Sequence, residues 1–543
     1  MASSESSLLL TGARVYTADP SVPWAEALVV RGSRLLYVGS EAEARERAGT
    51  GVEELHVPGG LAVPGFNDSH IHMSMGAHAL TTLNLEGTTS VRELQARLAA
   101  YASDHPDRPW IEGYGLPYEP FLAAANMPRT ALDTAVSDRP VFIYAFDTHT
   151  AWCNTTALAR SGIEHGSDLA LPNEVVVDER GLATGMLKER LAIDLVRRLL
   201  PTPSDEELDD MLVLAMQHVN RLGITSVQNM DGWPERLEQY DRLHERGDLT
   251  VRACHYLNVH DDTPRELLRD LAGLLGEYLT PWNRMGGIKL FIDGVVEAKT
   301  ALMHEPYADG TGDVGVPDMD LDHYRDLVIR ADALGMDVAT HAIGDRGSEL
   351  ALDAYGAALE GNGSVDVRHR IEHIEVLAPH NRSRFRELGV TASMQPLHAA
   401  PTGDPQFTPW TALVGPQREP FAFAWQSLLT AGAPLSFGSD WPIVSPDVRL
   451  GLHAAMTRAD TAGDPAGGWQ PQQCLTLAQA LNAYTTGAAY AEREEGRKGT
   501  LEHGMLADIA VFERDLFTLD PGEIPSVDIV LTIVDGRVVH RTT

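Results

Sequence analysis

The sequence contains few cysteines and no long apolar run. Its three cysteines, Cys153, Cys254 and Cys474, are odd in number and widely spaced, which argues against a disulfide framework. No stretch is apolar enough for long enough to span a bilayer. The first ten residues lack a positively charged segment and have too short an apolar run for a signal peptide. We therefore expect a cytoplasmic protein with no membrane partner.

Positive charge is also scarce. Lys and Arg total 43 against 77 Asp and Glu, so the formal net charge is −34 at pH 7. This charge repels phosphate backbones, and we do not expect nucleic acid as a partner. The acidity indicates a well-solvated surface, and a chain of 543 residues predicts more than one domain.

Several catalytic motifs are missing. The chain has no His-Glu-x-x-His, no Gly-x-Ser-x-Gly and no Walker lysine loop, which disfavours zincin proteases, serine esterases and P-loop enzymes. The run Gly310–Gly315 formally matches the dinucleotide-binding glycine pattern. Because it leads into Val316-Pro317 instead of opening a helix after a strand, we interpret it as a loop.

Short β-type runs alternate with helical stretches from residue 220 onwards, which is typical of a parallel α/β architecture. With one earlier run they make eight strands, the number in a (β/α)8 TIM barrel, whose active site lies at the C-terminal strand ends. The predicted strands are 61–68, 223–229, 250–257, 287–292, 337–341, 369–373, 390–395 and 434–440.

The distribution of these runs also predicts the domains. Small β segments at both termini indicate one β domain made from residues 1–60 and 496–543. The catalytic barrel is then expected over 61–80 and 221–495. Residues 81–220, between the first and second strands, mix helical and β-like stretches, and we expect them to form an inserted α/β cap domain.

Polar side chains occur at the predicted strand ends. His70 and His72 are two apart in a strand and would share a face, where paired imidazoles suit zinc and its neighbours. His341 and His373 end later strands. Asp440 ends the last one, where it could bind metal and accept a proton from metal-bound water. Any single histidine could instead be a satisfied core residue.

Lys289 lies between apolar residues of a predicted strand, where burial should lower its pKa. A neutral lysine amine can react with carbon dioxide to give a carbamate, an anion able to bridge two metals. The alternative is a lysine paired with Asp293 or another neighbour.

These residues resemble the amidohydrolase superfamily, and most closely its amidohydrolase 3 branch, which includes N-substituted formamide deformylases. The resemblance covers nearly the whole chain. It is carried by the motifs Pro64–His72, Ile288–Gly294 with Thr300–Leu302, Thr340–Arg346, His369–His373 and Gly438–Pro442.

The resemblance implies a β-sandwich beside the barrel and a binuclear metal centre. One ion would be held by His70, His72 and Asp440, the other by His341 and His373, with carbamylated Lys289 bridging them. The metals are expected to be two Zn²⁺, although Mn²⁺, Fe²⁺ or Co²⁺ would suit the same ligands. A metal-activated hydroxide would then attack an amide-like carbonyl while Asp440, the catalytic acid and base, moves the proton.

The sequence indicates substrate contacts less directly. Leu116-Pro117 and Val295–Lys299 depart from the branch's usual pattern where substrate should be recognised, so its known substrates do not transfer. Aromatic residues of the insert could line a pocket or form the insert's own core. The candidate contacts are Trp110, Tyr118, His149, Trp152, Glu297, Arg346, Gln395, His398 and Trp441.

We therefore expect a metal-dependent hydrolase that cleaves a C–N bond, such as an amide, N-acyl or N-formyl bond, in a small, moderately apolar molecule. A cyclic amidase or esterase on the same scaffold is the alternative. A non-catalytic scaffold protein is a further one, although such proteins usually lose metal ligands. We also expect a homodimer.

Overall fold

The structure of the protein is a computed structural model, and the described residues form two compact units. One unit is Met1–His72 with Met216–Thr543, and the other is Met73–Ala215. No helix among the described residues has the length and apolarity needed to cross a membrane. The described residues are 7–121, 127–146, 148–170, 173–399 and 407–542.

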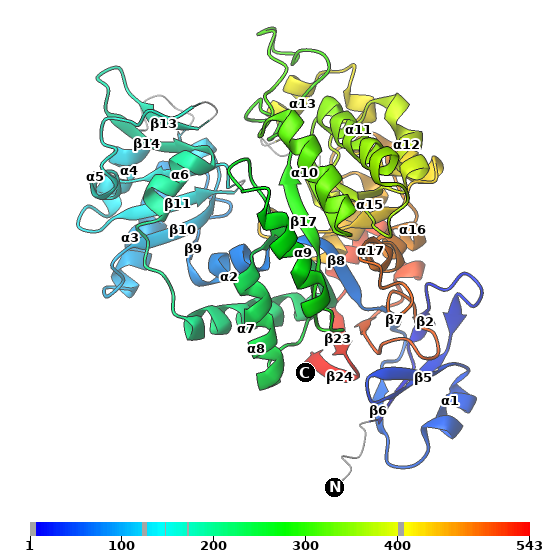
Figure 1. Ribbon diagram of the computed structural model, residues 1–543. Helices are drawn as coiled ribbons and strands as arrows, with labels where there is room; N and C mark the ends of the chain where they lie inside the picture. The colour runs from blue at the N-terminus through cyan, green and yellow to red at the C-terminus, as the bar shows by residue number, and fades with distance from the viewer. Residues whose placement is uncertain (1–6, 122–126, 147, 171–172, 400–406, 543) are drawn as a thin grey trace. The chain divides into compact units, whose positions relative to one another are not determined.

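An eight-stranded parallel sheet forms the centre of the first unit, and every strand is hydrogen-bonded to the next one along the chain (Figure 1). The first and the last of these strands along the chain approach each other at their C-terminal ends. There Asp440 donates its backbone N–H to the His70 carbonyl at 2.6 Å, and His72 donates to the Trp441 carbonyl at 2.9 Å. The strands are β8 (Phe66–Ile71), β15 (Ile224–Gly232), β16 (Arg252–Asn258), β17 (Asn283–Phe291), β18 (Asp337–Ala342), β19 (Arg370–His373), β20 (Thr391–Met394) and β21 (Leu435–Phe437).

Helices follow these strands and give the repeating β/α pattern, so the predicted TIM barrel is confirmed. The strands are almost entirely buried, as expected when both faces of a parallel sheet are covered. The main helices are α8 (Pro234–Arg246), α9 (Leu267–Glu277), α10 (Leu321–Ala333), α11 (Asp345–Asn362), α12 (Arg382–Leu388), α14 (Trp425–Thr430) and α15 (Val448–Thr457).

The first predicted strand, 61–68, is wrong as a single strand. Leu61–Pro64 is β7, which pairs with the terminal strands β22 (Ile509–Phe512) and β2 (Arg14–Tyr16), and only β8 belongs to the barrel. Gly65 separates them. A Cβ at this position would lie 2.4 Å from Thr225 Oγ1, so the chain turns here only with glycine.

Both termini contribute to one β-sandwich, as predicted. Its six-stranded sheet has the order β24-β23-β22-β7-β2-β3 and its four-stranded sheet the order β5-β4-β1-β6. In the first sheet, β22 from the C-terminal segment pairs with β7 from the N-terminal segment. Buried residues from both sheets, including Leu10, Val30, Ile509 and Leu531, form the common core. The other strands are β1 (Ser7–Thr11), β3 (Trp24–Ala25), β4 (Ala27–Arg31), β5 (Arg34–Gly39), β6 (Glu53–His56), β23 (Ile529–Val534) and β24 (Arg537–Arg541).

The second unit is an α/β insert after the first barrel strand, which confirms that part of the fold prediction. Its mixed sheet has the order β13-β14-β12-β11-β10-β9, with the helices α3 (Val91–Asp104), α4 (Pro128–Ala135), α5 (Thr155–Ser161) and α6 (Glu189–Arg197). Two buried apolar clusters stabilise it. The strands are β9 (Leu83–Asn84), β10 (Ile111–Leu116), β11 (Val141–Ala145), β12 (Thr150–Cys153), β13 (Glu174–Val177) and β14 (Ala183–Lys188).

Candidate metal centre

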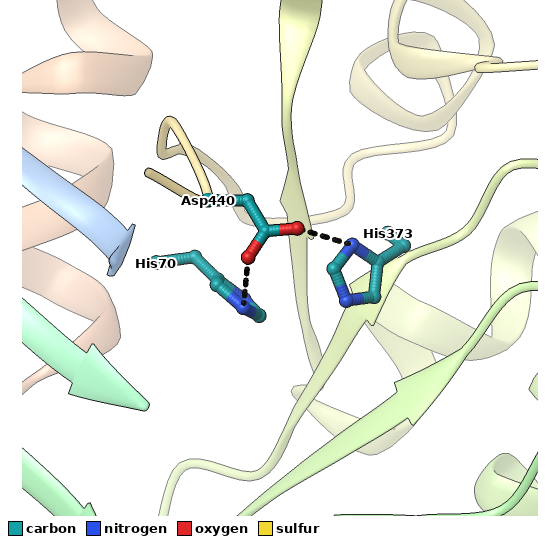
Figure 2. A group of neighbouring side chains, drawn as sticks. All are labelled: His70, His373 and Asp440. Atoms are coloured by element: carbon teal, nitrogen blue, oxygen red, sulfur yellow. Dashed lines mark ion pairs between the residues drawn. The ribbon is translucent and has the colours of Figure 1, made fainter. Parts of the chain in front are cut away.

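The carboxylate of Asp440, just beyond β21, is surrounded by imidazoles. Its Oδ1 lies 3.3 Å from His70 Nε2 and 3.0 Å from His72 Nε2. Its Oδ2 lies 3.4 Å from His398 Nε2 and 4.0 Å from His373 Nδ1. Figure 2 shows the carboxylate between His70 and His373, with one oxygen directed to each ring. These three residues each offer a ligand atom within 4.8 Å of the others.

The backbone holds this arrangement where the barrel closes. Asp68 Oδ1 accepts hydrogen bonds from the backbone N–H groups of Ser439, at 2.9 Å, and His70, at 3.2 Å. Asp440 and His373 have positive φ angles of 64° and 74°. This conformation is sparsely populated by non-glycine residues and persists where surrounding structure enforces it, often at functional sites.

A buried carboxylate orients His70. Glu372 in β19 lies with Oε2 2.6 Å from His70 Nδ1, and both side chains are buried. Because an ionised carboxylate only accepts, Nδ1 donates and the Nε2 lone pair is left facing Asp440. Metal-ligating histidines in proteins are commonly oriented by a carboxylate in this way.

Arg370 supports Glu372 in turn. Its Nε donates to Glu372 Oε1 at 2.5 Å, and its other nitrogens donate to the Ser69 carbonyl at 2.5 Å, to Ser393 Oγ at 2.6 Å and to Gln228. Burial alone would raise the pKa of Glu372, but the charge of Arg370 and the pairing with His70 hold it well below its ordinary value. Glu372 therefore stays ionised.

Burial lowers the pKa of His70, with help from the charge of Lys289, and it lowers the pKa of His373, with help from His341. Both rings are therefore neutral near pH 7, the form that binds metals. Burial would raise the pKa of Asp440, but His70, His72 and His373 together hold it well below its ordinary value. The centre thus presents an ionised carboxylate between the neutral imidazoles of His70 and His373.

Lys289 is buried in β17, and its Nζ makes no hydrogen bond to any described residue. Burial lowers its pKa to about 8, although Glu372 and Asp440 pull the other way. The alternative pairing with Asp293 is not found among the described residues. The Asp293 carboxylate instead accepts the backbone N–H groups of Leu302, Ile343 and Gly344 at 2.8, 3.0 and 3.0 Å.

His341 ends β18 beside His373, with ring centroids 4.6 Å apart, and its Nε2 lies 3.2 Å from the Gly294 carbonyl oxygen. The structure therefore brings all six predicted metal ligands to the C-terminal ends of the barrel strands.

The donor atoms around Asp440 fit a metal. Buried polar atoms normally have hydrogen-bond partners. Here five shielded nitrogens have none among the described residues, and imidazole and carboxylate together suit zinc and its first-row neighbours. These atoms are His70 Nε2, His72 Nδ1, Lys289 Nζ, His373 Nδ1 and His398 Nε2.

Two predicted substrate contacts, His398 and Trp441, lie beside Asp440, and a third, Gln395, follows a barrel strand. His398 contacts Asp440, and its Nδ1 lies 3.8 Å from Glu375 Oε1. Trp410 Nε1 donates to Glu375 Oε2 at 2.6 Å. Trp441 is buried and stacks on His218 with centroids 5.3 Å apart, while Gln395 is buried just after β20.

The remaining predicted contacts differ in position and in exposure to solvent. Arg346, in the first turn of α11, and Glu297, in the turn after β17, are exposed. In the second unit, Trp110 and Trp152 are buried in its two apolar clusters. Tyr118 donates to Thr150 Oγ1 at 2.7 Å, and His149 Nδ1 lies 2.9 Å from Glu189 Oε2. Their role in substrate binding stays a prediction.

Sequence reasoning gave no role to Glu372 or Arg370. One signal was present. Arg370 and Glu372 are two apart in a buried strand, so their side chains lie on the same face of that strand and do not face solvent. A charged pair on one face of a buried strand indicates a paired, functional network.

Known proteins are similar to this chain over almost its full length. It is 29% identical to Protein LONG AFTER FAR-RED 3 of Arabidopsis thaliana, covering 98% of this chain and 91% of that one. It is 26% identical to N-substituted formamide deformylase of Arthrobacter pascens, covering 99% of this chain and 98% of that one. A solved structure of an uncharacterised metal-dependent hydrolase from Pyrococcus horikoshii matches with a TM-score of 0.77 and 26% identity, covering 95% and 99%. The sequence profile of the amidohydrolase family matches residues 58–540, and the chain belongs to this family of metal-dependent hydrolases.

Proposed function

We propose that the protein hydrolyses a C–N bond, an amide or N-acyl bond that includes N-formyl, in a small, moderately apolar molecule. The observation that carries the proposal is the Asp440 carboxylate, which has two imidazoles near each oxygen. The similarity to a formamide deformylase over nearly the whole chain supports the bond type.

The ligand set supports two divalent ions, most simply two Zn²⁺. His70, His72 and Asp440 would hold one ion and His341 and His373 the other. Lys289 would bridge them as a carbamate, which is favoured by its burial and by the lack of a hydrogen-bond partner for its Nζ among the described residues. When bound, such ions lower the pKa of water and polarise the substrate carbonyl.

The protein's own groups would move the proton. Asp440 is ionised and shielded from solvent. In the proposed reaction it would accept a proton from the attacking water and deliver it to the leaving nitrogen. Glu372 fixes the tautomer and direction of His70. His398, 3.4 Å from Asp440 Oδ2, would restrain the carboxylate as the proton moves.

The test begins with metal-free protein prepared by chelation and reloaded with Zn²⁺, Mn²⁺, Fe²⁺ or Co²⁺. Elemental analysis gives the ions held per chain, and a panel of N-substituted formamides, other N-acyl compounds, cyclic amides and esters gives the bond cleaved. We expect two ions per chain and fastest turnover on an acyclic amide. Turnover confined to esters or cyclic amides would overturn the proposed bond, and a single ion with full activity would overturn the binuclear centre.

A further inference from the structure

A second set of metal-ligand side chains lies outside the candidate metal centre. We call His304, Glu349 and His380 the rim cluster. Glu349 Oε2 lies 2.5 Å from His380 Nε2 and 3.4 Å from His304 Nε2, and one ligand atom from each residue lies within 4.8 Å of the others. Neither the proposed function nor the family resemblance uses these three residues.

The rim cluster joins three neighbouring segments of the barrel. His304 follows β17, Glu349 lies in α11 after β18, and His380 lies in the short turn Pro379–Asn381 after β19. Because β17, β18 and β19 are adjacent and parallel, these segments all leave from the C-terminal ends of the strands, the face that carries the candidate metal centre.

Two of the three ligands are already held in place. The backbone N–H of His304 donates to Asp345 Oδ1 at 2.9 Å. The side chain of Asn381, which is fully buried, donates to Glu349 Oε2 at 3.0 Å. His380 is the most exposed of the three, with 65% of its side chain accessible to solvent, so its ring has room to adjust.

The donor spacing suits a small cation. In tetrahedral zinc sites with bonds near 2.0–2.1 Å, ligand atoms lie roughly 3.3 Å apart. The separation of His304 and Glu349 already matches this distance, while His380 would move outward by about 1 Å from its hydrogen bond as the ion replaces the proton. Two imidazoles and one carboxylate favour Zn²⁺, Ni²⁺ or Cu²⁺ over Mg²⁺ or Ca²⁺.

We propose that the rim cluster binds a divalent transition-metal ion that ties these three segments together. The segment of His304 also carries Gly294, whose carbonyl oxygen contacts His341, and Leu302, whose N–H binds Asp293. A bound ion would therefore restrain the segment that lies next to the second half of the candidate metal centre. Without an ion, the same residues form a hydrogen-bonded surface cluster of little energetic value.

The experiment uses the full chain with its tightly bound metal, after dialysis to remove loose ions. Zn²⁺ alone is then titrated by equilibrium dialysis against the unchanged protein and against His380→Ala, Glu349→Gln and a control, His165→Ala. His165 is an exposed histidine in the insert. We expect the unchanged protein and the control to take up one further ion, and both rim variants to bind it more than about tenfold more weakly.

The tightly bound metal must stay the same in every variant, which shows that each one is folded and that its candidate metal centre is intact. Cu²⁺ in place of Zn²⁺ adds a spectroscopic test: electron paramagnetic resonance should show nitrogen coupling from two imidazoles, reduced to one in His380→Ala. Equal uptake of the further Zn²⁺ by the protein and both rim variants would overturn the proposal. So would no further uptake by the unchanged protein.

Discussion

The barrel carries two clusters of histidine and carboxylate that differ mainly in burial. Around Asp440, burial keeps His70 and His373 neutral, and His70 Nε2 and His373 Nδ1 have no hydrogen-bond partner among the described residues. In the rim cluster, Glu349 hydrogen-bonds to His380, and water reaches both side chains. The difference indicates that ligand chemistry alone does not decide whether such side chains are arranged in advance for a metal. Glu372 and Arg370 orient the buried ligands through hydrogen bonds. In the rim cluster, the hydrogen bond between His380 and Glu349 satisfies these polar groups without an ion.

Asp440→Asn tests the buried cluster and should have the largest effect on turnover. The amide keeps an oxygen for the metal but cannot accept a proton, so kcat should fall by about 10²–10⁴-fold while most metal is retained. Steady-state kinetics and elemental analysis measure the two effects. Asp366→Asn, a change at a carboxylate with 97% side-chain exposure, serves as the control and should leave kcat unchanged. Near-normal turnover in Asp440→Asn would remove its role in proton transfer.

Lys289→Ala tests the proposed bridge. If the lysine is carbamylated, the variant should lose metal and most turnover, and short carboxylates such as formate or acetate should partly restore both. Elemental analysis with and without added carboxylate measures the effect. Lys188→Ala provides a matched control, because Lys188 is a partly exposed lysine of the insert paired with Glu174 at 2.9 Å. Full activity of Lys289→Ala without any added carboxylate would exclude the bridge.

Glu372→Gln and Glu349→Gln compare the two clusters directly by the same chemical change. Glu372→Gln leaves buried Arg370 without its charge partner, so metal-free protein should lose about 3–5 kcal/mol of stability. Metal affinity should also fall by about 10–100-fold, since His70 loses its orienting carboxylate. Glu349→Gln should change the stability by only about 0–1 kcal/mol.

Urea denaturation of the metal-free proteins and metal titration measure these differences. Equal stability losses in the two variants would show that burial does not distinguish the clusters. An unchanged metal affinity in Glu372→Gln would show that Glu372 does not position His70.

The sequence was enough to predict the strand-end residues, because a barrel places the C-terminal ends of its strands on one face and His70 and His72 share a face by their spacing. It could not reveal that Glu372 meets His70 across 302 residues, because that contact depends on how the inward faces of β8 and β19 align. The break at Gly65 did carry a signal, since a Pro-Gly dipeptide such as Pro64-Gly65 is typical of a turn. The close contact with Thr225 that requires the glycine exists only in the folded barrel.

The aromatic residues of the insert show a different limit. Trp110 and Trp152 are buried in the cores of the second unit. A sequence pattern cannot separate this role from pocket lining, because large aromatic side chains contribute burial area in both settings. The rim cluster was missed for a related reason: its three ligands come from a loop, a helix and a short turn, and they have no characteristic spacing.

The pH dependence of stability separates the effect of burial from that of metal binding. His255 in β16 is buried beside Tyr240, with ring centroids 4.6 Å apart, and burial lowers its pKa to about 3. Its unfolded pKa is about 6.5, so the unfolded chain binds more protons between these values. Stability from neutral His255 is therefore complete above pH ~6.5 and falls as the pH drops, by about 2 kcal/mol at pH ~5. Urea unfolding of metal-free protein at the two pH values should show this loss, and His255→Gln should reduce it by that amount while exposed His165→Gln should not. An identical pH dependence in His255→Gln would mean that burial of this imidazole does not set the acid sensitivity. Burial would then also fail to explain why His70 and His373 are neutral.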